Sequence, residues 1–451
     1  MKVKAKSVVL LGSLIFLTLT LVVIVFTLVT REKVTPTESQ AATLSSSKTI
    51  DNVNAKSYKY IPLQETPGRL EIQAEDINEK GQVTGYELIS GSPYSYYSLR
   101  IWDSNRKFMP ISNKTVSAKE NRGLKINESN QILGNFQNDQ GVTVHYIYDF
   151  KENLYKILSG TQTNTKEKLI LRPKQVSSTF NLDKSSGLNT IDSWTGVNDL
   201  NNQGQAVGVN NSAATLWIGG VNSTQQLVNL SSEIQSKTGR TNFWSTADKI
   251  SNEVNGVVNI LGRLQDNTTG IIEYFVLEYS IAKRQTSNVK ILTAPTGMEY
   301  KLPRGVSDDG TILVDCRYYI TGNKRVDDKC IFSKTDGYET KVYFSAIVEQ
   351  NGIKNLFFSD YAYLSRSGII TMISGMPFIN QFKTYIYNLN TKAFLDLTSL
   401  IANNQVTGIN ANSWQVFGID SNSKGEILVE MFAINGPNHS VGVLTPTVKI
   451  K

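Results

Sequence analysis

The sequence predicts an all-β fold, a seven-bladed β-propeller that follows an N-terminal transmembrane helix. Three observations predict it: a long uncharged run near the N-terminus, a turn phrase that recurs seven times after it, and strand-like apolar segments around each turn. With 451 residues, 40% hydrophobic and 19% charged, the chain is neither an acidic disordered chain nor a multi-span membrane protein. It is long enough for one large closed fold.

The uncharged run covers residues 7–30. As a helix rising about 1.5 Å per residue it would reach about 36 Å, which exceeds the ~30 Å hydrocarbon core of a bilayer. Three lysines lie within residues 1–6, so we expect a cytoplasmic N-terminus and a C-terminal domain outside the cytoplasm, periplasmic or extracellular. A cleaved signal peptide with a small-residue site at Ser39-Gln40-Ala41 is the alternative, and it would give a secreted protein. Because the apolar run is too long for a typical signal peptide, we expect a retained signal anchor that spans the membrane once.

Residues 31–54 contain eight Ser or Thr and few large apolar side chains. Such a segment cannot bury enough surface to offset the entropy of ordering its backbone. We expect a flexible tether with a reach of about 25 to 30 Å, followed by the propeller over residues 55–451.

The repeated phrase is clearest in Ile77-Asn78-Glu79-Lys80-Gly81-Gln82-Val83. It consists of a strand end, a polar turn whose Asn, Asp or Gly can adopt positive φ, and a β-branched strand that leaves the turn. Seven copies, some degenerate, begin at Ile77, Ile126, Leu200, Ile250, Val306, Leu364 and Ile419. Their turns are about 57 residues apart on average, with one unit enlarged.

Further apolar strands after each turn give four strands per unit, a sheet with two apolar faces and too little core to stand alone. The units must therefore stack, and four-stranded units of this length fit propeller blades better than β-helix coils or helical repeats. Closure of the ring usually requires a blade shared by the two termini. We expect Tyr58–Leu63 to complete the last blade beside Ser440–Leu444 or Val448–Lys451.

This phrase, Ile-Asn-x-x-Gly-Gln-Val-x-Gly followed by a strand with an aromatic end, resembles the bacterial extracytoplasmic repeat family called HAF. The resemblance covers nearly everything after the tether. The His-Ala-Phe triplet of the family is absent, and the aligned positions include Val144-His145-Tyr146 and His439-Ser440-Val441. The resemblance implies a cell-envelope or secreted repeat domain and carries no single activity.

The two cysteines, Cys316 and Cys330, lie 14 residues apart on either side of a polar loop. Because thiols outside the cytoplasm tend to become oxidised, we expect a disulfide that closes a long hairpin loop. The alternative is a pair of unlinked thiols packed in the sheet. No Cys-x-x-Cys motif is present, so neither redox catalysis nor a structural zinc site is predicted.

Aromatic residues recur six positions before the residue that opens the turn, or five in the last unit. They suggest an aromatic collar near the channel mouth that stacks on a sugar or peptide, with two glutamates at the same position in the first two units. The even spacing equally predicts packing between blades. The candidate ligand-binding residues are Trp194, Trp244, Tyr300, Phe358, Trp414, Glu71 and Glu120.

Neither a metal, a cofactor nor a catalytic motif is predicted. The segment Asp420–Gly425 alternates acidic and amide oxygens as a calcium loop does, but it lacks the later Glu, contains Lys424 and is a plain turn in the other units. Only two histidines are present, and the motifs of serine hydrolases, zinc proteases and phosphate loops are missing. The net charge of +7 depends largely on cations that flank the apolar run, so nucleic-acid binding is not supported.

Three functions are compatible with this pattern. The first is a non-enzymatic binding or scaffold module in the cell envelope, whose partner is an unknown envelope protein or glycan. The alternative is a propeller hydrolase or lyase that acts on glycans through channel-mouth carboxylates, which two close, buried acids with raised pKa would favour. The third is a structural domain of a larger secretion or surface assembly, which a large exposed apolar patch would favour.

Overall fold

A computed structural model describes the residues 57–91, 95–111, 121–137, 143–158, 170–171, 196–221, 223–320, 324–353, 358–376, 381–410, 413–434 and 438–447. Every described residue belongs to one compact unit, Asn52–Lys451. The predicted membrane segment and tether therefore lie outside the described residues. Within those residues, none of the helices is both long enough and apolar enough to cross a bilayer.

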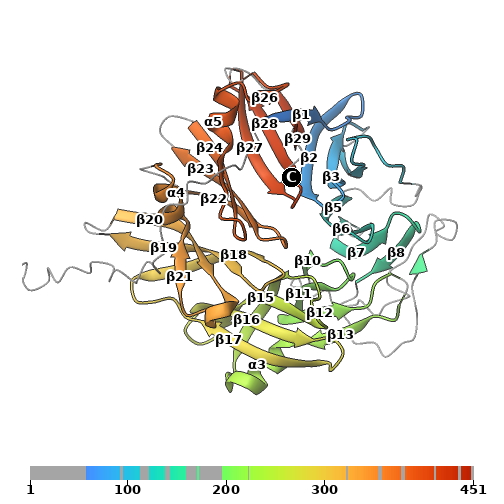
Figure 1. The fold of residues 1–451 in the computed structure, drawn as a ribbon. Coiled ribbons are helices and arrows are strands. Elements are labelled where there is room, and N and C mark those ends of the chain that lie inside the picture. Colours follow the sequence, from blue (N-terminus) through green and yellow to red (C-terminus); the bar gives the residue numbers. More distant parts are fainter. Residues whose placement is uncertain are drawn as a thin grey trace, which may run out of the picture. The chain divides into compact units, whose positions relative to one another are not determined.

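Seven β-sheets follow one another in chain order and form the seven-bladed propeller that the sequence predicts (Figure 1). Blade one consists of β2 (Arg69–Ile77), β3 (Val83–Ile89) and β4 (Tyr96–Trp102). Blade two consists of β5 (Arg122–Ile126), β6 (Gln131–Gln137), β7 (Thr143–Asp149), β8 (Leu154–Ile157) and β9 (Ile170–Leu171). Blade three consists of β10 (Gly196–Leu200), β11 (Ala206–Asn210), β12 (Ala213–Ile218) and β13 (Gln226–Asn229). Blade four consists of β14 (Phe243–Ile250), β15 (Val257–Asp266), β16 (Ile272–Ser280) and β17 (Gln285–Leu292). Blade five consists of β18 (Met298–Val306), β19 (Ile312–Ile320), β20 (Lys324–Phe332) and β21 (Lys341–Tyr343). Blade six consists of β22 (Phe358–Leu364), β23 (Ile369–Met376), β24 (Gln381–Asn388) and β25 (Phe394–Asp396). Blade seven contains β27 (Trp414–Ser421), β28 (Ile427–Ala433) and β29 (His439–Pro446), together with β1 (Tyr58–Pro62) and β26 (Val406–Thr407).

The N-terminal strand closes the ring. β1 pairs antiparallel with β29, so that Tyr60 lies opposite Leu444, and β26 pairs in parallel on the other side of β1. This is the first of the two predicted positions, beside Ser440–Leu444. The first and last blades are also joined by Arg106, whose side chain is 1% exposed and donates to the Gly81 carbonyl and to Glu426 at 2.6 Å.

The repeated phrase forms the turn between the innermost strand of each blade and the next strand. Its turn residue adopts the left-handed conformation, with φ of 78° at Gly81 and 61° at Asn130. A residue with a Cβ is strained there, which explains why the repeats place Gly or Asn at this position.

The Asn that recurs in four of the seven phrases forms hydrogen bonds between neighbouring blades. The Asn127 side chain accepts the N–H groups of Ser129 and Gln131 at 2.9 Å, and its amide donates to the Asn201 carbonyl of the next blade at 2.8 Å. The same inter-blade bond runs from Asn422 to Asn78, from Asn78 to Asn127, and from Asn201 to Ser251. The turn motif thus encodes both the hairpin and the contact between blades seven, one, two, three and four.

Apolar residues fill the spaces between blades rather than the interior of each one. Ile72 and Ala74 of blade one, for example, pack with Leu428, Val441 and Val443 of blade seven. Each blade therefore buries its two faces only against its neighbours, which is the physical reason for the closed ring.

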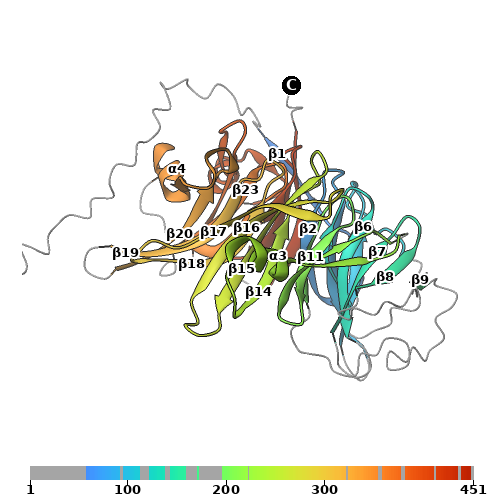
Figure 2. The same cartoon turned by 90° about the horizontal axis from the view of Figure 1, so that it is seen from below.

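In the described residues, three short α-helices were not predicted: α3 (Leu230–Thr238), α4 (Phe344–Gln350) and α5 (Leu397–Ala402). Each follows the outermost strand of its blade in the chain; α3 and α4 are labelled in Figure 2. Side-chain caps start two of them, since Asn229 accepts the N–H of Ser232 and Asp396 that of Ser399. Helices this short leave little room for a 3.6-residue period to appear in the sequence.

Cys316 on β19 and Cys330 on β20 are joined by a disulfide, with their Cα atoms 5.8 Å apart. Both cysteines are buried. The alternative of unlinked thiols does not apply. The expected long loop is instead a long hairpin, since β19 and β20 stay paired from Ile312 and Phe332 to Ile320 and Lys324, and the disulfide joins these two strands.

Candidate functional site

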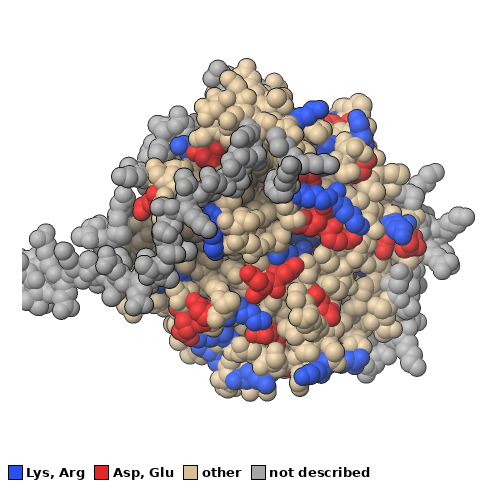
Figure 3. Space-filling view, viewed as in Figure 1, with Lys and Arg blue, Asp and Glu red and all other residues tan. Residues whose placement is uncertain are grey.

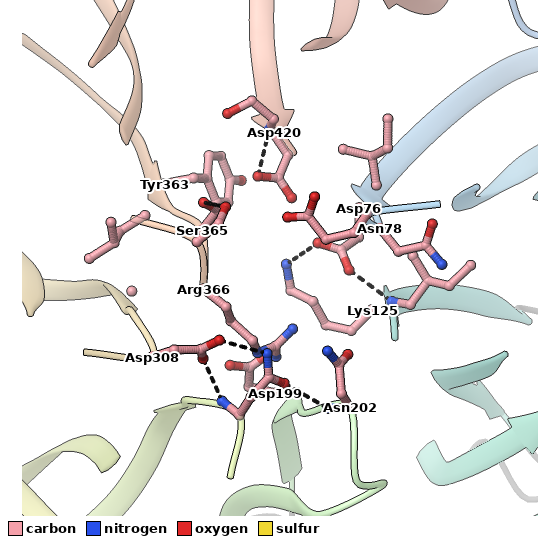
Figure 4. Close-up of a pocket in the computed structure, with 18 of the residues that line it drawn as sticks. Asp76, Asn78, Lys125, Asp199, Asn202, Asp308, Tyr363, Ser365, Arg366 and Asp420 are labelled. Carbon is pink, nitrogen blue, oxygen red and sulfur yellow. Dashed lines mark hydrogen bonds and ion pairs between the residues drawn. The ribbon is translucent and has the colours of Figure 1, made fainter. Parts of the chain in front are cut away.

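A hollow of about 340 Å³ opens where the innermost strands end at the repeated turns, and all seven blades contribute to its wall. The view in Figure 4 shows charged side chains from several blades converging on this space. It is the place in the described part of the chain where side chains from every blade meet.

One position per blade forms the wall of the hollow nearest the axis; we name this set the channel ring. Its members are Asp76, Lys125, Asp199, Lys249, Gly305, Tyr363 and Asp420. In six blades a register shift lies directly before the ring residue. In blade one, Ala74 pairs with Gly85 and Asp76 with Thr84, which leaves Glu75 as the extra residue of a β-bulge. Such a bulge bends the strand and re-aims its side chains, here at the end that borders the channel.

In the last blade the seventh copy of the turn phrase begins at a different residue from the one that the sequence predicts. Asp420 pairs with Leu428 and Ser421 with Ile427, as Asp76 pairs with Thr84 and Ile77 with Val83. The seventh copy therefore begins at Ser421 rather than at Ile419. Asn422 accepts the N–H groups of Lys424 and Glu426 at 3.1 Å, so the segment forms the plain turn that the sequence analysis favoured over a calcium loop.

A cluster of Asp76, Asp420 and Lys125 occupies one side of the hollow. Asp76 accepts Lys125 Nζ at 2.9 Å and the Ile126 N–H at 2.8 Å, and it shares a hydrogen bond with Asp420. Burial acts to raise the pKa of Asp76, but the Lys125 ammonium and these hydrogen bonds outweigh it and lower that pKa. Burial and the neighbouring Asp76 carboxylate raise the pKa of Asp420 well above its usual range. The two carboxyl groups therefore titrate as a pair, in which the pKa of Asp420 lies above that of Asp76.

Lys125 and Tyr363 meet across the channel. The Lys125 Nζ lies 5.9 Å from the centre of the Tyr363 ring, although the two residues belong to blades two and six. Burial alone would lower the pKa of Lys125, but Asp76, Asp420 and Asp199 raise it, so the ammonium stays charged. Burial likewise raises the pKa of Tyr363.

Arg366 spans the hollow from blade six to blade three. Its guanidinium donates to Asp199 Oδ1 at 3.0 Å, and Figure 4 labels both residues. The guanidinium also donates to the Leu200 carbonyl, and its Nε donates to the Ile250 carbonyl at 3.2 Å. Because a guanidinium presents several donors in a rigid plane, this contact fixes the distance between opposite blades.

Glu75, the bulge residue of blade one, is a second acid with a perturbed pKa. Burial raises the pKa of Glu75 to about 7, against the opposing effect of the Lys125 charge. It is half-buried, and its carboxylate makes no hydrogen bond or ion pair with the residues that the structure describes.

The position after the Asn or Ser of each turn forms the outer wall of the hollow, which we name the rim: Ser423, Glu79, Glu128, Asn202, Asn252, Asp308 and Arg366. Six of the seven rim residues donate their backbone N–H to the corresponding residue of the next blade, as Asn202 does to Asn252 at 2.9 Å and Asn252 to Asp308 at 2.8 Å. The chain of bonds runs from blade seven through blade one to blade six, where Arg366 accepts through its carbonyl. The rim is thus acidic at three positions and braced from blade to blade.

Figure 3 shows acidic and basic side chains interspersed over the middle of the face that it views. The mixture agrees with the wall of the hollow, where Asp and Lys alternate in the first four blades of the channel ring. Such a surface suits a small polar ligand better than a polyanion.

The sequence-predicted collar lies elsewhere, near the opposite ends of the innermost strands. Tyr300 is buried in the core between blades, in edge contact with Tyr274 and Phe332, and Trp414 packs against the core that contains β27. Trp244 is half-buried and Glu71 is exposed, and neither lines the hollow. Of Phe358 only the backbone position in β22 is described, and Trp194 and Glu120 lie outside the described residues. For Tyr300 and Trp414 these contacts agree with packing between blades.

Several exposed large apolar side chains also lie at the strand ends opposite the turns, among them Leu70, Tyr96, Ile271, Tyr319 and Phe432. The two ends of the propeller therefore differ, since the turn end is polar and charged. Nothing in the structure shows what covers the apolar side chains.

The channel ring was missed by sequence reasoning, although a signal was present. The residue directly before the opening residue alternates Asp, Lys, Asp, Lys in the first four copies. The predicted aromatic collar, six residues before the residue that opens each turn, lies instead at the far end of the same strands.

Comparison with known proteins finds likeness to solved structures only. No protein-family model matches the sequence, and no curated protein matches it. Similar solved structures include the β-propeller domain of the Trilobed protease from Pyrococcus furiosus, with 10% identity and a TM-score of 0.45 over 84% of this chain and 99% of that chain. Others are Hsv2 of Kluyveromyces lactis, with 11% identity and a TM-score of 0.35 over 81% and 94% of the chains, and dipeptidyl peptidase 4 of Porphyromonas gingivalis, with 9% identity and a TM-score of 0.37 over 84% and 60%. These values carry no conclusion about function, and the resemblance to HAF repeats stays a hypothesis.

Proposed function

We propose that the chain is a membrane-anchored extracytoplasmic β-propeller that acts as a binding module in the cell envelope, and that it binds its partner in the hollow at the turn end of the channel. The observation that carries this proposal is the braced, polar hollow to which all seven blades contribute. A site whose side chains are held by neighbouring groups loses little conformational entropy when a ligand binds. The uncharged run at 7–30 and the resemblance to HAF repeats support the envelope location.

Binding would be tested with the full chain in detergent against an array of envelope glycans and peptides. We expect a ligand that is recovered unchanged after incubation, with an affinity at least tenfold lower for Arg366→Gln, because Arg366 braces the hollow. The matched control is Arg325→Gln, whose side chain is 51% exposed and does not line the hollow. Equal binding by both variants would show that the hollow is not the binding site.

The location would be tested by cysteine labelling, since both native cysteines are in a disulfide. With Ser45→Cys in the tether, a membrane-impermeant maleimide should label intact bacterial spheroplasts that express the chain. Labelling only after lysis would contradict the orientation, and release of labelled protein into the medium would indicate the secreted alternative.

A second candidate is a glycan hydrolase or lyase. It is favoured by the buried carboxyl pair of Asp76 and Asp420, whose pKa values move in opposite directions, as an acid and a base require. Their mutual hydrogen bond argues against a hydrolase, because the two carboxyl groups of a glycosidase stand roughly 5 to 9.5 Å apart to admit the sugar. We therefore place binding first.

Incubation of the protein with envelope polysaccharides separates the two candidates. A hydrolase releases reducing ends and a lyase produces unsaturated uronic acids, and either activity should be lost in Asp420→Asn if this pair does the chemistry. Products formed equally by the wild type and this variant would exclude these carboxylates as the catalytic groups.

A further inference from the structure

Blades one to four repeat one arrangement twice. An aspartate of the channel ring in one blade accepts the backbone N–H of the next blade, from Ile126 to Asp76 at 2.8 Å and from Ile250 to Asp199 at 3.0 Å. In both cases a lysine of the ring directly precedes that isoleucine. The geometry therefore offers two equivalent Asp–Lys pairs.

The first pair forms and the second does not. Asp76 Oδ1 accepts Lys125 Nζ at 2.9 Å, whereas the corresponding oxygen of Asp199 accepts Arg366 from blade six at 3.0 Å. Arg366 thus occupies the place that Lys249 would take by analogy. Lys249 makes no hydrogen bond or ion pair with any residue that the structure describes, and it borders the hollow.

A half-buried cation without a partner is costly, because protein replaces part of its hydration shell. Burial lowers the pKa of Lys249, and the positive charge of Lys125 lowers it further, although Asp199, Asp248 and Asp76 oppose this. An anion in the hollow would supply the missing partner and remove this cost.

We propose that Lys249 anchors a carboxylate of the ligand in the hollow, so that the ligand is a small polar molecule or chain end with one carboxylate. This inference rests on the proposed binding function and adds the chemical class of the ligand. The class follows from the surrounding charge. The rim carries Glu79, Glu128 and Asp308, which would repel a doubly charged phosphate more strongly than a monoanion, and Lys249 supplies a single positive charge.

Two sources of such a carboxylate fit the same chemistry, an acidic sugar and a peptide C-terminus. The probes are D-glucuronate against D-glucose, and N-acetyl-alanyl-alanine against its C-terminal amide, with inorganic phosphate as a further anion. Binding is measured by isothermal titration calorimetry on the full chain, next to the ligands found on the envelope array. Lys249→Gln removes the charge, Lys249→Arg keeps it, and the exposed Lys283→Gln is the control.

We expect at least one carboxylate probe to bind tenfold or more tightly than its neutral partner, and the pair that shows the preference identifies the source. Lys249→Gln should abolish the preference, while Lys249→Arg and Lys283→Gln should retain it. Arg366→Gln should also abolish it although Lys249 is intact, because Asp199 becomes free to pair with Lys249. A purely structural role of Lys249 would instead weaken the binding of neutral and acidic probes alike.

The inference is overturned if phosphate binds more tightly than the carboxylates, if neutral and acidic probes bind equally, or if Lys249→Gln keeps the preference. In each of these cases the proposed binding function still stands if a ligand from the envelope array binds in the hollow. If neither probes nor array ligands bind, both proposals fail.

Discussion

Replacement of Asn127 tests whether the repeated turn phrase holds the ring together. The Asn127 side chain is 1% exposed and makes four hydrogen bonds, two as an acceptor from Ser129 and Gln131 and two as a donor to Gln131 and Asn201. Asn127→Ala removes all four, and at a net value of about 1 kcal/mol each the free energy of unfolding should fall by about 4 kcal/mol. A loss of this size reflects buried partners that water cannot reach.

The assay is urea unfolding followed by tryptophan fluorescence and circular dichroism, with Asn288→Ala as the control. Asn288 is exposed on β17, and its replacement should change the free energy of unfolding by about 0.5 kcal/mol or less. Asn127→Asp keeps the two acceptor contacts but faces the Asn201 carbonyl with a carboxylate, so it should be at least as damaging at neutral pH. A loss in Asn127→Ala no greater than that in Asn288→Ala would refute the role of the inter-blade bond.

Three further predictions concern stability. Reduction of the disulfide, or the double variant Cys316→Ser with Cys330→Ser, should lower the free energy of unfolding by about 3 kcal/mol, because the bond closes a loop of this size in the unfolded chain. Thiol titration should find no free thiol before reduction and two after it. An unchanged midpoint of urea unfolding would contradict the estimate. Arg106→Ala leaves Glu426 largely buried without its cation and should cost about 3 kcal/mol, measured in urea beside the exposed control Arg325→Gln; equal losses would show that the contact between the first and last blades does not stabilise closure. Burial raises the pKa of Glu75 from 4.5 to about 7, so ionisation of Glu75 disfavours the folded state above pH 7 and this penalty disappears as the pH falls from 7 toward 4.5. Glu75→Gln should therefore exceed the wild type in free energy of unfolding by about 2 kcal/mol at pH 8, after allowance for its partial exposure, and by nothing near pH 4.5, whereas a pH-independent difference would contradict the assignment.

Most of the fold was predictable because the repeats are local. The positive φ at Gly81 and the bonds that the Lys80 and Gln82 N–H groups donate to the Asn78 side chain depend only on residues a few positions apart, so they leave a readable phrase in the sequence. The same phrase locates the innermost strand and, by its sevenfold recurrence, the number of blades. The short helices were missed because they arise from single caps, such as Asn229, after an outer strand.

The candidate site was only partly predictable. The sequence contains the alternation of Asp76, Lys125, Asp199 and Lys249, but a β-bulge of one residue decides which side of the strand faces the channel. Aromatic residues at an even spacing drew attention to the opposite strand ends, where Tyr300 and Trp414 pack between blades.

The sequence by itself determined the repeating unit, the number of blades and the strand that closes the ring, since each follows from contacts between near neighbours or from the need to bury two apolar faces. The tertiary structure alone decided that Arg366 reaches Asp199 across the channel and leaves Lys249 unpaired among the described residues, and that Asp76 lies beside Asp420 and raises its pKa. Those contacts join residues up to 344 positions apart in the chain. They depend on the diameter of the closed ring and on the bulges that aim the side chains, and neither quantity is written in any short stretch of sequence.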